Sequence, residues 1–498
     1  MRALAFIATA LTSVACAAGN VFAPGTSQSN EAAIVVTEPA LLRAAPRDSA
    51  QQQAQLHQGD LLEVRGEKLD YLQVYDHQRE RTGYVRASQV RRTAMQAGDA
   101  PGLLAVVRFV RDAPGSEALG IAFAAAYLQA APAETLRGAE GVEALDALGT
   151  MADRLAHRGS SGAELTRNAQ ATLSAHLDVA AHYGIAFRTQ EQGNRMQVCY
   201  EGDAFRRVLA MEATPVQKAR AALALTRGEC IFEPMQPDKR KPVDEWRAEV
   251  LDRVDVAGVP GYVRAQVLMR RAQVWAAIAY ERTRLGGNAE GAAQRSLAEF
   301  ASVNRNDLVE ADQATYNDTA MRVSASRWAA QPRTAPIARQ PSVVTVAGAP
   351  GETCVLLVDA KNDERHPLVR RCTYGIVWAQ SARLNREGNA IALAVQPLEA
   401  WRELWVFRRR GNAWTVAVMP PGSVEPNVGY IEFAGWVPGG RQMLVVREVR
   451  GEGKYRRSFE VVSLDSMGAT RQSGDAAQLG SFRRWQDAAW KRMTVSMR

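Results

Sequence analysis

The chain has 498 residues, of which 47% are hydrophobic and 23% are charged, and its formal net charge at pH 7 is +8. This composition is that of an ordinary folded protein and excludes a wholly disordered, collagen-like or coiled-coil chain. The length is sufficient for about three domains, and a mean hydropathy of −0.24 argues against a polytopic membrane protein.

The N-terminus has the pattern of a secretory signal peptide. A basic residue precedes an apolar run at 3–11 that is too short to span a bilayer, and small residues follow it. Ala15-Cys16-Ala17 fits the cleavage pattern of a soluble exported protein, whereas Ser13-Val14-Ala15-Cys16 resembles a lipobox, which would place a lipid on Cys16. We favour a signal peptide at 1–18 and a soluble periplasmic protein. The alternative is an outer-membrane lipoprotein, which alone would associate peripherally with the membrane.

Under either cleavage the mature chain keeps four cysteines, and an even number in an exported protein predicts disulfides. The order along the chain favours the pairs Cys199–Cys230 and Cys354–Cys372. Cys199 opens one helical pattern and Cys230 follows the next, so the two ends meet in an antiparallel helical hairpin. Four buried thiols or a metal site are the alternative, but the sequence has no C-x-x-C motif and no histidine at ligand spacing.

Residues 19–32 contain a stretch rich in glycine, serine, asparagine and glutamine and are expected to form a linker. Residues 33–93 are expected to form a small all-β barrel, because short apolar or alternating runs are separated by glycine and proline turns. The runs are Ile34-Val35-Val36, Leu61-Leu62-Glu63-Val64, Tyr71-Leu72-Gln73-Val74 and Tyr84-Val85.

Four motifs in this segment resemble the bacterial SH3-like (SH3b) domain, a small barrel that many exported bacterial proteins carry. They are Leu41-Leu42-Arg43-Ala44-Ala45-Pro46, Leu56-x-x-Gly59-Asp60-x-x-x-Val64, Tyr71-Leu72-x-Val74 and Gly83-Tyr84-Val85. The resemblance implies binding of cell-wall peptides or of a partner protein, and not catalysis. It makes Arg43, Tyr75 and Tyr84 candidate binding residues, with burial in the barrel core as the alternative for the tyrosines. The family commonly has tryptophan where Tyr84 stands.

Residues 100–330 are expected to form an all-α array, because apolar residues recur three and four positions apart. These helical patterns cover 116–129, 139–158, 163–183, 263–285 and 307–328, and a polar loop is expected at 234–242. Neighbouring patterns are loosely similar to tetratricopeptide hairpins, but no repeat of fixed period occurs. A solenoid with a groove and a simple helical bundle both fit this pattern.

Residues 331–341 contain three prolines and are expected to link the helices to an all-β domain at 342–498, where seven of the ten tryptophans lie. Two stretches, 382–393 with 403–406 and 436–446 with 459–462, resemble the repeat of the propeller that accompanies the bacterial Tol system. A segment of about 150 residues holds roughly three such blades, too few to close a ring. This favours an incomplete propeller-like domain or a sandwich.

The excess positive charge lies in this last segment, since residues 341–498 contain 22 Lys+Arg and 15 Asp+Glu, a difference of +7. Arg408, Arg409 and Arg410, near Trp401 and Trp405, are predicted to form a basic aromatic surface for an anionic partner, with a solvated hairpin tip as the alternative. A basic face suits anionic cell-wall polymers or lipid. We do not expect an exported protein to have a nucleic-acid partner.

The sequence lacks the common motifs of catalysis and of metal or cofactor binding. Its six histidines form no H-E-x-x-H motif, and no G-x-S-x-G motif, Walker loop or dinucleotide fingerprint occurs. We therefore expect no metal and no cofactor.

Together these observations predict a multidomain α+β protein that acts as a noncatalytic binding or scaffolding factor of the Gram-negative cell envelope. Its expected partner is a cell-wall polymer or an envelope protein. The alternatives are a cell-wall hydrolase or its accessory subunit, and a periplasmic adaptor that binds only protein.

Overall fold

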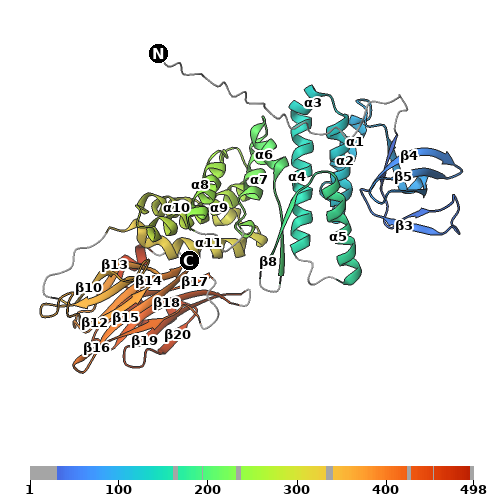
Figure 1. The fold of residues 1–498 in the computed structure, drawn as a ribbon. Coiled ribbons are helices and arrows are strands. Elements are labelled where there is room, and N and C mark those ends of the chain that lie inside the picture. Colours follow the sequence, from blue (N-terminus) through green and yellow to red (C-terminus); the bar gives the residue numbers. More distant parts are fainter. Residues whose placement is uncertain are drawn as a thin grey trace, which may run out of the picture.

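The computed structural model describes residues 31–160, 166–192, 195–231, 237–332, 340–422, 428–451 and 454–493. An N-terminal antiparallel sheet, a central helical region and C-terminal multi-stranded sheets follow one another along the molecule (Figure 1). This mixed architecture agrees with the expected order of β, α and β segments. The expected signal peptide, Cys16 and most of both expected linkers lie outside the described residues.

The N-terminal sheet has seven strands in the order β3-β2-β6-β5-β4-β1-β7. Their bounds are β1 Ala32–Val35, β2 Ala40–Arg43, β3 Gln52–Leu56, β4 Leu61–Lys68, β5 Tyr71–Asp76, β6 Arg81–Arg86 and β7 Val90–Thr93. Alternate residues of the strands, such as Leu72, Val74 and Val85, form a buried core. The predicted strand runs do not include β2, β3 or β7, and of these β3 and β7 are largely polar strands that pair through their backbones.

The central region consists mainly of helices, and consecutive helices pack on one another. The bounds are α1 Ala100–Val110, α2 Glu117–Ala130, α3 Ala133–Arg137, α4 Ala139–Ser160, α5 Arg167–His182, α6 Asp203–Ala210, α7 Pro215–Leu225, α8 Pro237–Asp252, α9 Gly261–Arg284, α10 Glu290–Ala301 and α11 Gln313–Ser326. One apolar core lies among α1, α2, α4, α5 and α6, and two further cores lie among α7 to α11. The expected helical patterns therefore match real helices to within a few residues, except at 307–328, where the helix begins at Gln313.

Two parts of the central region differ from the sequence expectation. The antiparallel hairpin β8 Phe187–Gln192 and β9 Arg195–Tyr200 interrupts what was expected to be an all-α segment. Helix α8 occupies most of the expected polar loop at 234–242 and contains Pro242. Ion pairs from Asp244 to Arg240 and Arg247, four and three residues apart, support a helix that its proline content argues against.

The C-terminal part contains two sheets. The small sheet has the strands β10 Ser342–Ala347, β11 Thr353–Val358 and β12 Val369–Thr373. The large sheet has β13 Ile376–Leu384, β14 Ala390–Leu398, β15 Trp401–Arg410, β16 Ala413–Met419, β17 Val428–Val437, β18 Gln442–Gly451, β19 Lys454–Ser463 and β20 Ala469–Ser473, followed by helices α12 Gly480–Trp485 and α13 Ala488–Met493. Side chains of β11 pack against β14 and β15 in one apolar core, so the two sheets lie face to face.

The large sheet consists of two antiparallel units of four consecutive strands, β13 to β16 and β17 to β20. A short parallel pairing of Trp401 and Arg402 in β15 with Gly429 and Tyr430 in β17 joins the units. Among the described strands this pairing produces one continuous eight-stranded sheet and no closed ring.

Two cysteine pairs lie at bonding distance, which is compatible with the predicted disulfides. The sulfur atoms are 2.10 Å apart in Cys199–Cys230 and 2.00 Å apart in Cys354–Cys372. The expected helical hairpin between the first two cysteines is present as α6 and α7, but Cys199 lies on strand β9 and Cys230 ends the 3₁₀ helix Gly228–Cys230, so the cysteines flank the two helices and are not part of them. Cys354 and Cys372 face each other on the neighbouring strands β11 and β12.

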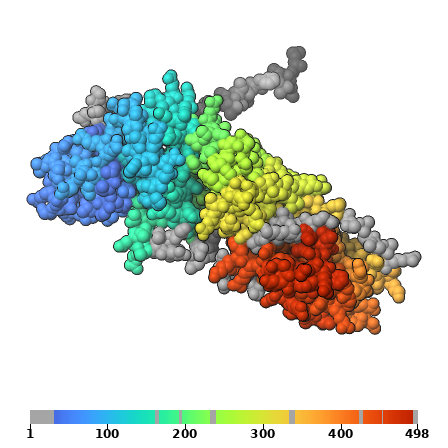
Figure 2. All heavy atoms as spheres, turned by 180° about the vertical axis from the view of Figure 1, so that it is seen from behind, coloured from blue at the N-terminus to red at the C-terminus, as the bar shows by residue number. Residues whose placement is uncertain are grey.

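The helical region rests on the large sheet along α11 and the end of α9 (Figures 1 and 2). Two apolar clusters join them, one containing Tyr280, Trp328 and Trp378 and the other containing Met321 and Tyr430. In the described ranges, none of the helices combines the length and the apolar character needed to cross a membrane.

Candidate functional site

An open cleft of about 830 Å³ lies where the helical region meets the large sheet. Strand β8, the 3₁₀ helix after α7, helices α8, α9 and α11, the turn between β14 and β15, and strands β18 and β19 form its walls. The cleft is rich in charge, with five arginines and four acids: Arg240, Arg247, Arg270, Arg322, Arg450, Glu191, Glu229, Asp318 and Glu399. Guanidinium groups gathered in a concave surface favour carboxylate or phosphate ligands.

Ion pairs bridge the cleft from the helices to the sheet. Arg322 of α11 donates from Nε to Asp318 at 2.7 Å and from Nη1 to Glu399 at 3.1 Å. Arg450 of β18 also binds Asp318, at 3.2 Å, and Arg240 of α8 reaches Glu399 at 3.5 Å. Each of the two carboxylates thus serves two arginines, and the network fixes the sheet relative to α8 and α11. Burial opposes the charge of Arg322, yet the carboxylates of Asp318 and Glu399 raise its pKa above the ordinary value.

Arg247 is a structural arginine at the base of the cleft. Its Nε and Nη2 donate to the carbonyl oxygen of Thr226 at 3.0 and 2.7 Å, and its Nη1 donates to Asp244 at 2.7 Å. Burial lowers the pKa of Arg247. These bonds occupy the guanidinium and anchor α8 to the end of α7.

Arg270 of α9 differs from the other arginines of the cleft. Its guanidinium makes one hydrogen bond, from Nη1 to the carbonyl oxygen of Leu223 at 3.3 Å. In the described part of the chain, no carboxylate lies within ion-pair distance of it, and Glu229 is the carboxylate that most favours its charged form. Burial lowers the pKa of Arg270 to about 10, so the side chain remains cationic at neutral pH. An incompletely paired cation at the wall of a cleft is suited to bind an anionic group.

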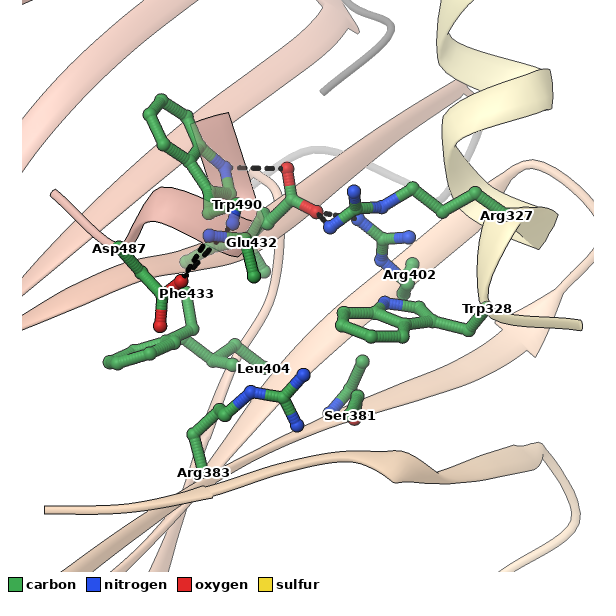
Figure 3. A pocket seen from close by; sticks show the side chains of 13 residues that line it. Arg327, Trp328, Ser381, Arg383, Arg402, Leu404, Glu432, Phe433, Asp487 and Trp490 are labelled. Carbon is green, nitrogen blue, oxygen red and sulfur yellow. Dashed lines mark hydrogen bonds and ion pairs between the residues drawn. The ribbon is translucent and has the colours of Figure 1, made fainter. Parts of the chain in front are cut away.

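A second, closed cluster lies beside the cleft, at the contact between the helices and the large sheet (Figure 3). Glu432 of β17 accepts from Arg402 at 3.2 Å, from Arg327 and, through its other oxygen, from Trp490 Nε1 at 3.0 Å. Arg402 is fully buried and also donates to the carbonyl of Ala325 at 3.3 Å. The cavity within this cluster measures about 20 Å³, which is room for little more than a water molecule. The cluster is therefore structural.

The three candidates from the SH3-like motifs share one face of the N-terminal sheet. Arg43 and Tyr84 are directly opposite each other on β2 and β6, and Tyr75 is a diagonal neighbour of Tyr84 on β5. All three are half-buried and lie on the face opposite the core residues of the sheet. Arg43 donates to the carbonyl of Ala50 at 3.0 Å, and the guanidinium of Arg65 lies 4.1 Å from the centre of the Tyr75 ring.

The expected basic aromatic surface on the C-terminal domain is wrong in its aromatic part. Trp401 and Trp405 are only 2% and 3% exposed, because β15 is a central strand and packing covers both of its faces. Arg409 and Arg410 are exposed at the end of β15, whereas Arg408 is half-buried and donates to the carbonyl of Asp465 at 3.0 Å. The arginines thus lie at a strand end without the tryptophans.

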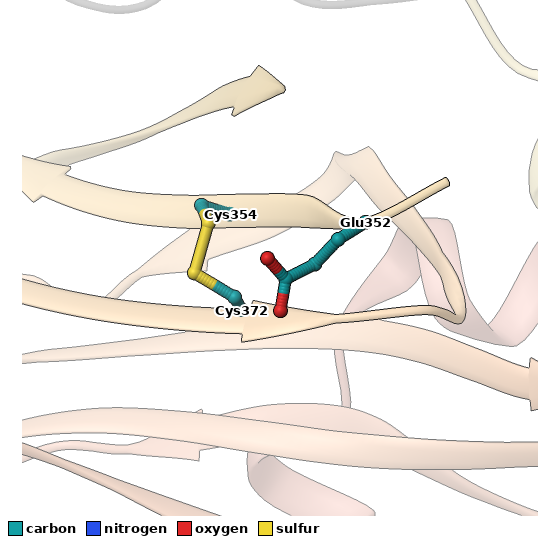
Figure 4. A group of neighbouring side chains, drawn as sticks. All are labelled: Glu352, Cys354 and Cys372. Atoms are coloured by element: carbon teal, nitrogen blue, oxygen red, sulfur yellow. A yellow bond between two sulfur atoms is a disulfide. The ribbon is translucent and has the colours of Figure 1, made fainter. Parts of the chain in front are cut away.

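One group of side chains in the described residues has the spacing of metal ligands. The ligand atoms of Glu352, Cys354 and Cys372 lie within 4.8 Å of one another (Figure 4). Two of these three atoms are the sulfurs that lie at disulfide distance, and a disulfide sulfur does not bind metal as a thiolate does. The oxidised site therefore offers a metal only the carboxylate of Glu352.

The residues of the cleft are not among the candidates predicted from the sequence. Arg270 lies within the apolar pattern expected at 263–285, and an arginine inside such a pattern was the one available signal. Asp318, Glu399 and Arg450 come together only because the sheet packs on α11.

Comparison with known proteins adds no identification: no family model matches the chain, and neither a curated protein nor a solved structure matches it.

Proposed function

We propose that this chain is an exported, noncatalytic binding or scaffolding protein of the cell envelope that holds an acidic partner in its arginine-rich cleft. The observation that carries the proposal is the composition of the cleft, in which arginines from three helices and one strand converge and Arg270 makes no ion pair with a described residue. The partner is a cell-wall polymer or an envelope protein with exposed carboxylates.

Two of the four cleft carboxylates, Asp318 and Glu399, support binding over catalysis. A general acid or base needs a carboxylate that is free to form a hydrogen bond with the substrate and to exchange a proton with it. Asp318 and Glu399 are instead each engaged by two arginines that connect the helices to the sheet. Their arrangement maintains the shape of the cleft.

The N-terminal sheet supplies a second contact in this proposal. Its resemblance to the bacterial SH3-like domain implies recognition of a peptide, and the shared face of Arg43, Tyr75 and Tyr84 supports that assignment. For the C-terminal part, the face-to-face packing of the two sheets favours a sandwich over a partial propeller. The order of helix contacts favours an array over a simple bundle.

Export to the periplasm belongs to the same proposal. It is supported by the signal-peptide pattern and by two cysteine pairs at disulfide distance. Mass spectrometry of the mature protein tests this part, since acylation of Cys16 would identify a lipoprotein.

Co-sedimentation of the purified mature chain with insoluble cell-wall sacculi tests the function. We expect the chain to sediment with sacculi, and Arg270→Gln to reduce the bound fraction more than Arg253→Gln, a matched loss of one exposed charge outside the cleft. A chain that stays in the supernatant would favour the protein-binding adaptor. Clearing of a sacculus gel by the mature protein would overturn the noncatalytic assignment.

A further inference from the structure

An open pocket of about 360 Å³, called the cavity below, adjoins the cleft between the helices. Helices α4, α6, α7, α9 and α11 line it, and Arg270 and Thr315 belong to both the cavity and the cleft. A volume of this size lies in the range of small-ligand pockets, commonly about 300 to 1,000 Å³. Arg270 therefore faces a pocket large enough to receive a small molecule or the end of a chain.

Among the described arginines that line the cavity, Arg270 is the one without an ion pair, and Glu229 of the cleft, which lies 3.9 Å from Arg227, is the carboxylate that most favours the charged form of Arg270. Arg220 pairs with Asp146, and Arg227 pairs with Asp153. Arg270 has only its hydrogen bond to a carbonyl oxygen. The carboxylates of Asp146 and Asp153 each offset the charge of the arginine with which they pair. The cavity is thus complementary to a single anionic group.

The rest of the wall suits a short apolar group next to that anion. Phe205, Val216 and Leu223 contribute apolar surface, and Gln266 and Thr315 contribute polar side chains near Arg270 on α9 and α11. Arginine recognises a carboxylate with a planar fork of N–H donors. A carboxylate attached to a small apolar residue fits this lining, because the carboxylate can bind Arg270 while the apolar group contacts the apolar wall.

We propose that this cavity binds the free C-terminal carboxylate of a short peptide, with Arg270 as its anchor and the apolar wall holding the last side chain. This inference rests on the proposed function, because it names the chemical class of the acidic partner that the cleft admits. The peptide backbone extends from the cavity into the cleft through the opening that Arg270 and Thr315 share.

Isothermal titration calorimetry on the mature chain tests the proposal with N-acetyl-alanyl-alanine and its C-terminal amide. The two probes have the same size and apolar surface and differ in the carboxylate. We expect the acid to bind at least ten-fold more tightly than the amide. Equal binding of acid and amide, or no binding of the acid at millimolar concentration, would overturn the proposal. So would inorganic phosphate binding as tightly as the acid, because the site would then be a general anion site.

Three variants assign the binding to this cavity. Arg270→Gln is expected to weaken the acid at least ten-fold, and Arg253→Gln, which removes an exposed charge, is expected to leave it unchanged. Val216→Phe narrows the cavity without touching Arg270 and is expected to abolish binding while the far-ultraviolet circular dichroism stays native. Because this variant reduces the volume of the cavity and keeps Arg270, it tests whether the ligand binds there even if Arg270→Gln fails to fold. Full binding by Val216→Phe would place the ligand elsewhere.

The failure of this inference and that of the proposed function are distinguishable. A chain that sediments with sacculi but does not bind the dipeptide retains the envelope function and loses this ligand assignment. A chain that binds the dipeptide but stays in the supernatant of sacculi retains the cavity and loses the wall partner.

Discussion

Glu38, in the turn between strands β1 and β2, accepts a hydrogen bond from Nε2 of His176 on helix α5, at 2.7 Å. The other carboxylate oxygen of Glu38 is 2.5 Å from Nδ1 of His57, so one carboxylate lies between two histidines. Tyr183, also at the end of α5, donates to the carbonyl of Gly59 at 2.7 Å. These contacts join the N-terminal sheet to the helical region through polar groups, beside a shared apolar core that includes Ile34.

The Glu38 bridge predicts a loss of stability in acid. Burial raises the pKa of Glu38, but the hydrogen bonds from His176 and His57 outweigh it and lower the pKa from 4.5 to about 2. A depressed pKa contributes stability that is complete above pH 4.5 and lost as the pH falls toward 2. Glu38→Gln should therefore cost about 1 to 2 kcal/mol at pH 6 after allowance for solvent screening, and little at pH 2.5.

Urea unfolding followed by circular dichroism between pH 2.5 and 7 measures this difference. Glu212→Gln, in an exposed segment between α6 and α7, is the matched control and should show no such dependence. If the free energies of unfolding of wild type and Glu38→Gln differed by the same amount across this pH range, the proposed role of the Glu38 bridge would be contradicted.

Glycine is required at position 59, where the N-terminal sheet contacts helices α2 and α5, for two reasons. Its φ of +92° is in the left-handed region, and a Cβ there would lie 2.7 Å from the carbonyl oxygen of Ala118 and 2.9 Å from Val179. We expect Gly59→Ala to lower the free energy of unfolding by about 1 to 3 kcal/mol. It should also increase hydrogen exchange along α5. Gly98→Ala, where a Cβ meets nothing within 4 Å, should be near neutral, and equal stability of the two variants would refute this explanation.

Glu432 is predicted to be critical for the contact between the helices and the large sheet. Glu432→Gln would leave the buried guanidinium groups of Arg327 and Arg402 without their carboxylate. Removing one partner of a buried ion pair costs about 3 to 5 kcal/mol. Chemical unfolding of Glu432→Gln should show a loss of this size in the free energy of unfolding, whereas Glu364→Gln, on an exposed loop, should lose almost no stability. A loss below about 1 kcal/mol would indicate that the site is solvated, as surface pairs are.

The cysteine pairs predict that the native, unreduced protein has no free thiol among its four described cysteines. The Cys199–Cys230 bond would join residues 31 positions apart. Closing a loop of this length stabilises a fold by about 3 to 4 kcal/mol, and the double variant Cys199→Ser, Cys230→Ser should lose a similar amount. Thiol titration in denaturant without reductant checks the pairing. Free thiols at Cys354 and Cys372 would instead turn Glu352 and both sulfurs into a set of metal ligands.

The sequence by itself determined the order of the segments and the cysteine pairs. Hydrophobic periodicity located helices such as α4 and α9 and strands such as β4 and β5. An element that buries one face has apolar residues at the period of a helix or a strand, so the pattern is visible in the sequence. The same reasoning missed β3, whose residues are mostly polar, and α8, where Pro242 suggested a loop. Backbone pairing with β2 holds β3 in the sheet, and the ion pairs of Asp244 together with packing on α9 stabilise α8, so these contacts outweigh the local preference of each segment.

The tertiary structure alone decided where the chemistry lies. Trp401 and Trp405 looked like surface aromatics beside an arginine run, but a central strand with two covered faces buries them. Arg270 looked like an ordinary residue of an amphipathic helix, and only the packing of α4, α7, α9 and α11 places it between a cavity and a cleft. Periodicity reports which side of an element is apolar, and it carries no information about which other element that side meets. Ion pairs between residues more than 70 positions apart, such as Arg322 with Glu399, therefore had to come from the fold.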